Sequence, residues 1–354
     1  MLINNKKNLV MKKKTALITG VSGQDGAYLA KFLLKKNYKV IGTDRRNSRD
    51  NGWRLNFLNI KDKIILEDLD ICEITNVMRI FNKYNFDEVY NLAAQSFVQS
   101  SFFHPITTTN VTAIGALNIL EVIRNNKRKI KFYQASSSEM FGNSTSQNSN
   151  YLNEKSEFNP QSPYAIAKVF AYYTTQNYRN SYNIFTTNGI LFNHESPLRG
   201  EEFITRKITK GFAKILNGEK KPITVGNIYA KRDWGFAGDY VEAMWKMMQQ
   251  KKPDDYVIAT GKSHSIKEFI NYCTNILDLK TKWVGSGLNE KLINVENKKI
   301  LVQINKKFFR PAEVNYLRGN CIKAKKMLKW KPKKNLKELA QLMLSEDIKF
   351  INAS

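Results

Sequence analysis

A glycine-rich turn between a short apolar run and an amphipathic helix pattern constrains this chain more than any other feature. Residues 20–26 read Gly-Val-Ser-Gly-Gln-Asp-Gly; they follow the strand-like run 15–19 and lead into a predicted helix over 24–36. Glycines at this spacing permit a tight turn, close approach of the backbone to a pyrophosphate, and close helix–strand packing. The N–H groups at the helix N-terminus then face the anion. We therefore predict a dinucleotide-binding turn with contacts from Gly20, Ser22, Gly23, Gln24, Asp25 and Gly26.

The rest of the N-terminal half alternates apolar runs with helical patterns. Further strands are predicted at 38–43, 64–69, 89–93, 131–135, 183–191 and 256–259, and helices at 113–123, 163–178 and 239–250. This alternation is typical of βαβ units and a parallel sheet. We predict an α/β fold, a Rossmann-type doubly wound parallel sheet with a smaller α/β substrate-binding lobe.

The length of 354 residues exceeds one average domain and favours two lobes that share a cleft. We expect residues 14–193 with about 231–260 to form the Rossmann domain. Residues from about 194–230 with 261–354, whose pattern is more broken and helical, are expected to form the second lobe. Residues 1–13 are expected to be a disordered extension in which Met11 is an alternative start, and the Asn- and Ser-rich segment 143–156 a surface loop.

The net charge of +26 admits three interpretations. A nucleic-acid binder would concentrate its cations on one element, whereas lysines recur here from Lys6 to Lys349 with no block longer than three. A site for a polyanionic small molecule needs only a few cations. We favour a general enrichment in lysine, which affects solubility and steering but not the fold, and we expect no nucleic-acid partner.

The cysteines indicate a reducing compartment. Cys72, Cys273 and Cys321 are far apart and fit neither a C-x-x-C pattern nor zinc spacing, so we expect no metal site and no disulfide scaffold. No stretch approaches the roughly 18 apolar residues that span a bilayer, and the N-terminus lacks the apolar core of a signal peptide. We expect a cytoplasmic protein without a membrane partner.

The residues after the second predicted strand indicate which dinucleotide binds. A carboxylate there accepts from the ribose 2′-OH of NAD, whereas an arginine pairs with the 2′-phosphate of NADP. The chain has both, because Asp44 precedes Arg45 and Arg46. Two guanidinium groups can form paired hydrogen bonds with a phosphate, so we favour NADP and expect the Asp44 side chain to point away from it. For Arg46 the alternative of a solvated cluster of charges in a loop remains. The residues expected near the adenine and ribose are Asp70, Leu92, Ala93, Ala94 and Ser96.

A Tyr-x-x-x-Lys pattern occurs twice, at Tyr151…Lys155 and Tyr164…Lys168. The first match lies in the polar loop, where no helix fixes the spacing, so we reject it. The second follows Pro163, which is favoured in the first turn of a helix. Residues four apart share a helix face, so Lys168 is expected to favour the Tyr164 phenolate and to hold the nicotinamide ribose.

Hydroxyls and a carboxylate follow the strand at 131–135. Hydroxyls at the carboxyl end of a parallel strand face the ligand crevice, so Ser137 is expected to bond the reacting oxygen. Glu139 is the informative residue, because a ketoreductase or 4-epimerase needs only Ser or Thr, Tyr and Lys. A carboxylate beside that triad indicates a second proton transfer at carbon. We predict Ser137, Glu139, Tyr164 and Lys168 as the catalytic residues.

Together these motifs resemble the GDP-mannose 4,6-dehydratases, a family of extended short-chain dehydrogenase/reductases, from about residue 14 to 345. The matching segments are 20–26, 45–46, 91–96, 132–142, 162–168, 189–197, 205–209, 232–235 and 309–314. The resemblance implies conversion of GDP-mannose to GDP-4-keto-6-deoxymannose and water, by internal hydride transfer from C4 to C6 through NADP. This reaction is the first step towards GDP-fucose or other GDP-deoxysugars.

The resemblance also implies residue roles. Tyr164 with Ser137 takes the 4-OH proton, and Glu139 serves both as base at C5 and as acid for the C6 hydroxyl, because Ser138 stands where related dTDP-glucose dehydratases have Asp. It places His194 and Arg199 at the cofactor, and it implies a homo-oligomer, either dimer or tetramer. The residues implied for the GDP-sugar are Asn193, Thr205, Lys207, Arg232, Arg310 and Glu313.

Three alternatives remain. The same reaction on a related sugar such as GDP-manno-heptose is not distinguished by the sequence. A nucleotide-sugar 4-epimerase or reductase shares the fold, but Glu139 argues against it. A non-catalytic NADP-sensing or nucleic-acid-associated protein would exploit the charge, but the complete triad argues against it.

Overall fold

The computed structural model describes residues 13–48, 51–144, 151–309, 312 and 314–352. The expected N-terminal extension, except for Lys13, lies outside the described residues, as do the middle of the polar loop and the predicted substrate residues Arg310 and Glu313. All statements of absence below concern the described residues.

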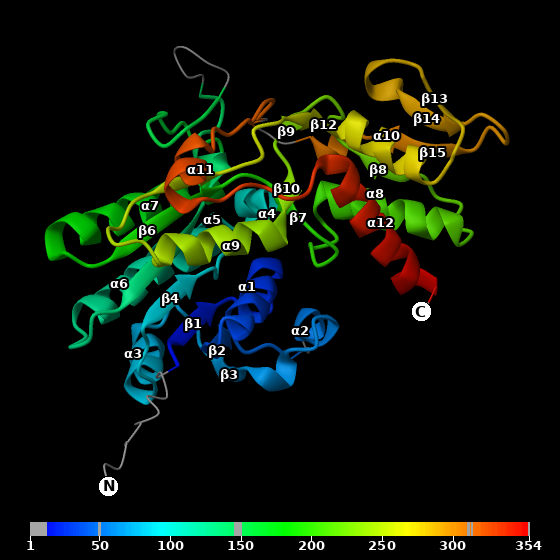
Figure 1. Cartoon of the computed structure of the whole chain (residues 1–354). Coiled ribbons are helices and arrows are strands. Elements are labelled where there is room, and N and C mark those ends of the chain that lie inside the picture. Colours follow the sequence, from blue (N-terminus) through cyan, green and yellow to red (C-terminus); the bar gives the residue numbers. More distant parts are fainter. Residues whose placement is uncertain (1–12, 49–50, 145–150, 310–311, 313, 353–354) are drawn as a thin grey trace, which may run out of the picture.

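A parallel sheet of seven strands forms the centre of the larger lobe (Figure 1). Its order is β11-β6-β5-β4-β1-β2-β3, and every neighbouring pair is parallel. Central strands such as β4 and β6 are buried along their whole length, as expected for a sheet covered on both faces. The strands are β1 (Thr15–Thr19), β2 (Lys39–Asp44), β3 (Ile65–Asp68), β4 (Glu88–Asn91), β5 (Lys131–Ser137), β6 (Thr186–Leu191) and β11 (Tyr256–Ile258).

Helices cover both faces of this sheet. On one face α1 (Gln24–Lys35) packs beside α9 (Ala237–Met248), and their apolar residues join one buried cluster. On the other face α3 (Ile74–Lys83), α6 (Gly115–Arg124) and α7 (Pro163–Tyr182) pack together, burying residues such as Val77 and Ile119. The strand order and the two helical layers confirm the predicted doubly wound Rossmann-type fold.

One helical run is longer and more apolar than expected. The segment α5 (Pro105–Thr109), a π-helical turn (Asn110–Ile114) and α6 together run from Pro105 to Arg124 and meet the length and composition criteria for a membrane span. Polar residues such as Thr109, Asn110 and Glu121 interrupt this run, so it contains no continuous apolar stretch of the length that the expectation concerned. Core helices of folded proteins meet the same criteria, and α6 buries Ile119, Leu120 and Ile123 against the sheet.

The smaller lobe has its own core and is α/β as predicted, but the broken sequence pattern did not locate the strands of its sheet. Strands β13 (Thr281–Val284), β14 (Lys291–Asn294), β15 (Ile300–Ile304) and β8 (Ile223–Val225) form it in that order. It packs with α8 (Ile204–Leu216), α10 (Ile266–Ile276) and α12 (Leu336–Asn352) around Phe212, Phe269 and Met343. No residue of β13 is fully buried, and its sequence Thr-Lys-Trp-Val does not alternate polar and apolar side chains.

The C-terminal segment is divided between the two lobes differently from the expectation. Helix α11 (Ile322–Leu328) lies beside β11 and α9, on the larger lobe (Figure 1). Trp330 donates its indole N–H to the carbonyl of Asp239 at 2.8 Å and is buried in the larger lobe's core. The chain therefore returns to the Rossmann lobe at about 314–330 before α12 completes the smaller one.

The remaining elements are short. They are α2 (Trp53–Phe57), α4 (Val98–Phe103), the 3₁₀ turns η1 (Lys61–Lys63), η3 (Ser138–Met140), η4 (Gly287–Asn289) and η5 (Lys306–Phe308), and the two-residue strands β7 (His194–Glu195), β9 (Lys231–Arg232), β10 (Gly235–Phe236) and β12 (His264–Ser265).

Candidate active site

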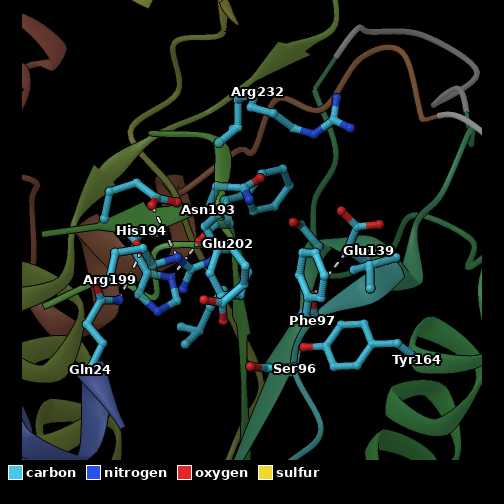
Figure 2. Close-up of a pocket in the computed structure, with 18 of the residues that line it drawn as sticks. Gln24, Ser96, Phe97, Glu139, Tyr164, Asn193, His194, Arg199, Glu202 and Arg232 are labelled. Carbon is cyan, nitrogen blue, oxygen red and sulfur yellow. Dashed lines mark hydrogen bonds and ion pairs between the residues drawn. The ribbon is translucent and has the colours of Figure 1, made fainter. Parts of the chain in front are cut away.

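One cavity lies at the carboxyl ends of the central strands and extends to the smaller lobe. Figure 2 shows Glu139 and Tyr164 on one side of it, His194 and Arg199 on the other, and Arg232 at its far end. Open α/β sheets bind ligands at this edge. From the predicted sites, the cavity lining includes Gly20, Gly23, Gln24, Asp25, Gly26, Leu92, Ala94, Ser96, Ser137, Glu139, Tyr164, Lys168, Asn193, His194, Arg199, Lys207 and Arg232.

The dinucleotide turn has the geometry that its glycines suggested. Gly20 has φ +71°, and a Cβ on it would lie 3.0 Å from the Cα of Ala93. A Cβ on Gly26 would lie 2.4 Å from the carbonyl oxygen of Gly20. Gly20 is therefore required for the turn, and Gly26 for close packing of α1 against it.

Asp44 does not point away from the turn, contrary to the expectation. Its Oδ2 accepts the backbone N–H of Ser22 at 3.0 Å, and burial raises the pKa of its carboxyl against the effect of that hydrogen bond. Arg45 and Arg46 are exposed and lie outside the cavity lining. Asp70 also lies outside it, and its Oδ1 accepts the N–H of Cys72 at 2.9 Å.

Ser137 and Glu139 are placed by the turn that ends β5. The Ser137 hydroxyl caps η3 by accepting the N–H of Glu139 at 3.2 Å. This bond holds the Glu139 backbone at the cavity wall, where the side chain is buried. The position of both residues at the carboxyl end of a buried strand explains why their side chains reach the same cavity.

Tyr164 and Lys168 share a face of α7. Ser162 caps this helix by accepting the N–H of Ala165 at 3.1 Å, and Pro163 occupies its first turn. The ammonium of Lys168 lies 5.7 Å from the centre of the Tyr164 ring and donates to the carbonyl of Ala135 at 2.6 Å. Burial raises the pKa of Tyr164 to about 12, against a hydrogen bond with Ser137, and lowers the pKa of Lys168 to about 8.

The rejected Tyr-x-x-x-Lys pair lies elsewhere. The Tyr151 hydroxyl accepts a hydrogen bond from Arg318, and Leu152 forms a β-bridge with Gly319. Lys155 is exposed, and neither residue lines the cavity.

His194 and Arg199 lie on the segment that leaves the sheet for the smaller lobe. The His194 ring has Asp25 at Nε2 and the carbonyl of Phe192 at Nδ1. The Arg199 guanidinium lies 3.6 Å from the centre of the Phe203 ring, and its Nε is 3.2 Å from a carboxylate oxygen of Glu195. His194 therefore contacts the dinucleotide turn through Asp25.

The residues expected at the GDP-sugar divide into two groups. Asn193, Lys207 and Arg232 line the cavity, and the Oδ1 of Asn193 is buried with no hydrogen-bond partner among the described residues. Thr205 does not line the cavity: it is buried and donates its hydroxyl to Glu195 at 2.5 Å. Its position favours a role in orienting Glu195 instead of direct contact with a ligand.

The sequence did not single out several residues of this site. Phe97 and Phe203 line the cavity from different lobes, with ring centroids 5.6 Å apart at 75°. Arg54 bridges the carbonyls of Ser22 and Leu198, at 3.2 and 2.6 Å. Phe97 directly follows the predicted segment 92–96, but Phe203 and Arg54 carry no local signal, because their contacts depend on how the lobes meet.

Comparison of the sequence with known families gives a match to "GDP-mannose 4,6 dehydratase" over residues 17–343. GDP-mannose 4,6 dehydratase 1 of Arabidopsis thaliana is 46% identical, covering 98% of this chain and 93% of the plant protein. GDP-mannose 4,6 dehydratase of Drosophila melanogaster is 45% identical, covering 96% and 87%.

Solved structures share the fold at lower identity. UDP-glucose 4-epimerase of Thermotoga maritima has a TM-score of 0.79 at 21% identity, covering 96% of this chain and all of that one. dTDP-glucose 4,6-dehydratase of Bacillus anthracis, in complex with NAD, has a TM-score of 0.78 at 18% identity, covering 95% and 97%. The protein RMD of Pseudomonas aeruginosa, in complex with NADPH, has a TM-score of 0.74 at 18% identity, covering 95% and 100%.

Proposed function

The chain belongs to the GDP-mannose 4,6-dehydratase family, and from this premise we propose that it converts GDP-mannose to GDP-4-keto-6-deoxymannose and water. The observation that carries the proposal is the buried carboxylate of Glu139 in the same cavity as Ser137 and Tyr164. With a dinucleotide as hydride acceptor, oxidation of an alcohol needs only Ser137, Tyr164 and Lys168. A carboxylate beside them supplies the base and acid that removal of water requires.

Each of these residues has a distinct task. Tyr164, hydrogen-bonded with Ser137, takes the proton of the sugar 4-OH as that carbon is oxidised. The ketone at C4 acidifies the C5–H bond, and Glu139 removes that proton. Glu139 then protonates the C6 hydroxyl, which leaves as water; the adjacent Ser138 cannot share this task. Lys168 supplies a positive charge one helical turn from Tyr164.

The residues around the turn fit a nicotinamide dinucleotide. A side chain at Gly20 or Gly26 would meet neighbouring backbone atoms. Because these residues are glycines, the backbone of the turn and the N-terminus of α1 are accessible to a diphosphate. Lys168, His194 and Arg199 border the same cavity. A nicotinamide held by these residues would supply the acceptor for the C4 hydride and its donor to C6, so no external oxidant would be consumed.

NADP is the proposed cofactor in preference to NAD. Asp44 uses one carboxylate oxygen to accept from Ser22, whereas the exposed guanidinium groups of Arg45 and Arg46 follow at the end of the same strand. Paired guanidinium groups suit a 2′-phosphate.

The proposed GDP-sugar site lies towards the smaller lobe. Lys207 and Arg232 supply positive charge for the diphosphate, and the unpartnered oxygen of Asn193 is available to a hydroxyl of the ligand. Burial lowers the pKa of Lys207, so its charge is stabilised when an anion binds. Arg310 and Glu313 stay in the proposal on the resemblance alone.

We propose that the protein forms a homo-oligomer through α4, α5 and α7. Large apolar side chains are exposed on these adjacent helices: Phe103 is 75% exposed, Ile106 73%, Ile166 58% and Tyr173 55%. An apolar surface of this kind on helices marks a protein interface, and one helical face meets its own copy about a twofold axis. A cytoplasmic location is proposed because the three cysteines are free.

A direct assay tests the function. The purified protein is incubated with GDP-mannose and NADP⁺, and mass spectrometry follows the nucleotide sugar. We expect the loss of one water. A product of unchanged mass would indicate a 4-epimerase instead, and turnover of GDP-manno-heptose alone would move the assignment to the larger sugar.

A further inference from the structure

The imidazole of His194 has an acceptor at each ring nitrogen. Its Nε2 lies 2.6 Å from Oδ2 of Asp25, and its Nδ1 lies 2.8 Å from the carbonyl oxygen of Phe192. A neutral imidazole carries one N–H and would place a lone pair against one of these oxygens. Only the imidazolium donates to both.

We propose that Asp25 keeps His194 protonated, and that the pair is a positioning device that fastens the dinucleotide turn to the segment 194–199. Asp25 is then a positioning residue and not a ligand of the cofactor. The proposal rests on the proposed function only for the identity of the dinucleotide.

The surroundings of the pair support this assignment. The His194 and Asp25 side chains are 12% and 21% exposed, and the imidazole stacks on Tyr240 of α9 at 4.7 Å. Burial alone disfavours the charged imidazole, but the Asp25 carboxylate outweighs it and raises the pKa of His194. The pKa of Asp25 is lowered, because the imidazolium outweighs its burial.

Other charged groups face the pair from each neighbouring element. Arg199, on the same segment as His194, opposes its protonation and favours the Asp25 carboxylate. Lys168 and Tyr164 of α7 and Tyr133 of β5 also lie within the electrostatic influence of Asp25. The charge on Asp25 therefore acts on two catalytic residues as well as on His194.

Further hydrogen bonds join the same two segments. Gln24 donates to the carbonyl of His194 at 3.1 Å and accepts from the hydroxyl of Ser196 at 2.7 Å. Arg54 connects Ser22 to Leu198. The dinucleotide turn and the segment 194–199 are thus bonded at several points, and the Asp25–His194 contact is the ion pair among them.

The pairing has a consequence for anion binding. Asp25 lies in the first turn of α1, beside the N–H groups that would face a diphosphate. An unpaired carboxylate there would repel the anion, and the imidazolium cancels its charge. The pair is intact below the raised pKa of His194 and is lost as the pH rises through it, so cofactor retention should fall over the same range.

Nuclear magnetic resonance tests the proposal directly, because the chain has only three histidines. The protein is labelled with ¹³C at histidine Cε1 and titrated from pH 5.5 to 9. His194→Gln identifies the His194 signal by its disappearance. We expect that signal to titrate above the ordinary histidine pKa of about 6.5. In Asp25→Asn the imidazole stays buried but loses its carboxylate partner, so the His194 signal should titrate below the ordinary histidine pKa.

Glu268→Gln is the matched control, because Glu268 lies 3.6 Å from His264 and not at His194. It should leave the His194 signal unchanged. As a second readout, NADPH release is followed by fluorescence during a chase with excess NADP⁺, and Asp25→Asn should accelerate it by roughly tenfold or more.

Two results would overturn the proposal: a His194 signal that titrates near the ordinary value in the wild type, or one unmoved by Asp25→Asn. The histidine titration needs no bound nucleotide. Failure to bind any dinucleotide would therefore count against the proposed function while leaving the pairing to be decided by the titration.

Discussion

The ammonium of Lys168 lies beneath the ring of Tyr164, 5.7 Å from its centre, yet its hydrogen bond goes to the carbonyl of Ala135 and not to the phenol. Lys168 therefore acts on Tyr164 through charge and not through a direct bond. Burial raises the pKa of the Tyr164 phenol to about 12, against the hydrogen bond with Ser137, and nearby positive charge would favour the phenolate further. We therefore expect the rate of turnover to depend on the protonation state of Lys168.

The first prediction follows from the pKa of Lys168, which burial lowers to about 8. Below that pH the side chain is cationic, and above it the charge beside Tyr164 is lost. We expect kcat to fall as the pH rises through about 8. Lys168→Ala should reduce turnover by about 10²–10⁴-fold, whereas Lys155→Ala, in the exposed loop, should leave the pH–rate profile unchanged.

The second prediction separates the oxidation from the elimination. Glu139→Gln keeps the size of the side chain but removes the base, so it should bind GDP-mannose, retain some oxidation at C4, and lose dehydration by about 10²–10⁴-fold. Tyr164→Phe should block the earlier oxidation instead. Absorbance of the reduced nicotinamide and mass spectrometry of the sugar distinguish the two steps. Dehydration by Glu139→Gln at nearly the wild-type rate would place the base elsewhere.

The third prediction concerns the choice of dinucleotide. Wild-type protein should bind NADPH more tightly than NADH, because Arg45 and Arg46 follow β2. Arg45→Ala should reduce this preference by about 1.5–3 kcal/mol, the value of a hydrogen bond to a charged group. Dissociation constants for both cofactors provide the measurement, and Arg128→Ala, a partly exposed arginine outside the cavity, is the control. Equal affinities in the wild type would contradict the assignment.

Local patterns in the sequence were sufficient for the sheet of the larger lobe. The predicted strand 15–19 matches β1 at both ends, and the predicted 38–43 and 131–135 overlap β2 and β5 within two residues. Each of these strands is a buried apolar run, which is a strong signal. In the smaller lobe, β13 and β14 are short, partly exposed and include Lys282 and Lys291, so no continuous apolar run marks them.

Some features of the site could not be predicted from the sequence, for a different reason. The orientation of Asp44 depends on a backbone N–H in another segment, and the partner of His194 is Asp25, distant along the chain. Thr205 belongs to a matching motif, but its hydroxyl faces Glu195. Motifs indicate which residues gather at a site, whereas the direction of each side chain is set by packing between the lobes.

The fourth prediction tests the apolar surface on α4, α5 and α7. Ile106→Asp places a charge at a side chain that is 73% exposed, so it should spare the fold but disrupt association. Sedimentation velocity should show an oligomer for the wild type and a smaller species for the variant. Leu216→Asp, at a residue 50% exposed on α8, is the matched control and should leave the oligomer intact. A wild-type monomer would rule out the interface.

The fifth prediction concerns the fate of the hydride. In the proposed reaction C4 is oxidised and C6 is reduced within one binding event, so a label on C4 should be carried to the new methyl group. The cavity supports this, because the dinucleotide turn, Tyr164 and Glu139 all line it, so the ketone and the reduced cofactor would occupy neighbouring positions in one site. With GDP-mannose deuterated at C4, mass spectrometry of the product should find deuterium at C6. Deuterium in solvent or in released NADPH would instead favour an ordinary oxidoreductase, in which the hydride leaves with the cofactor.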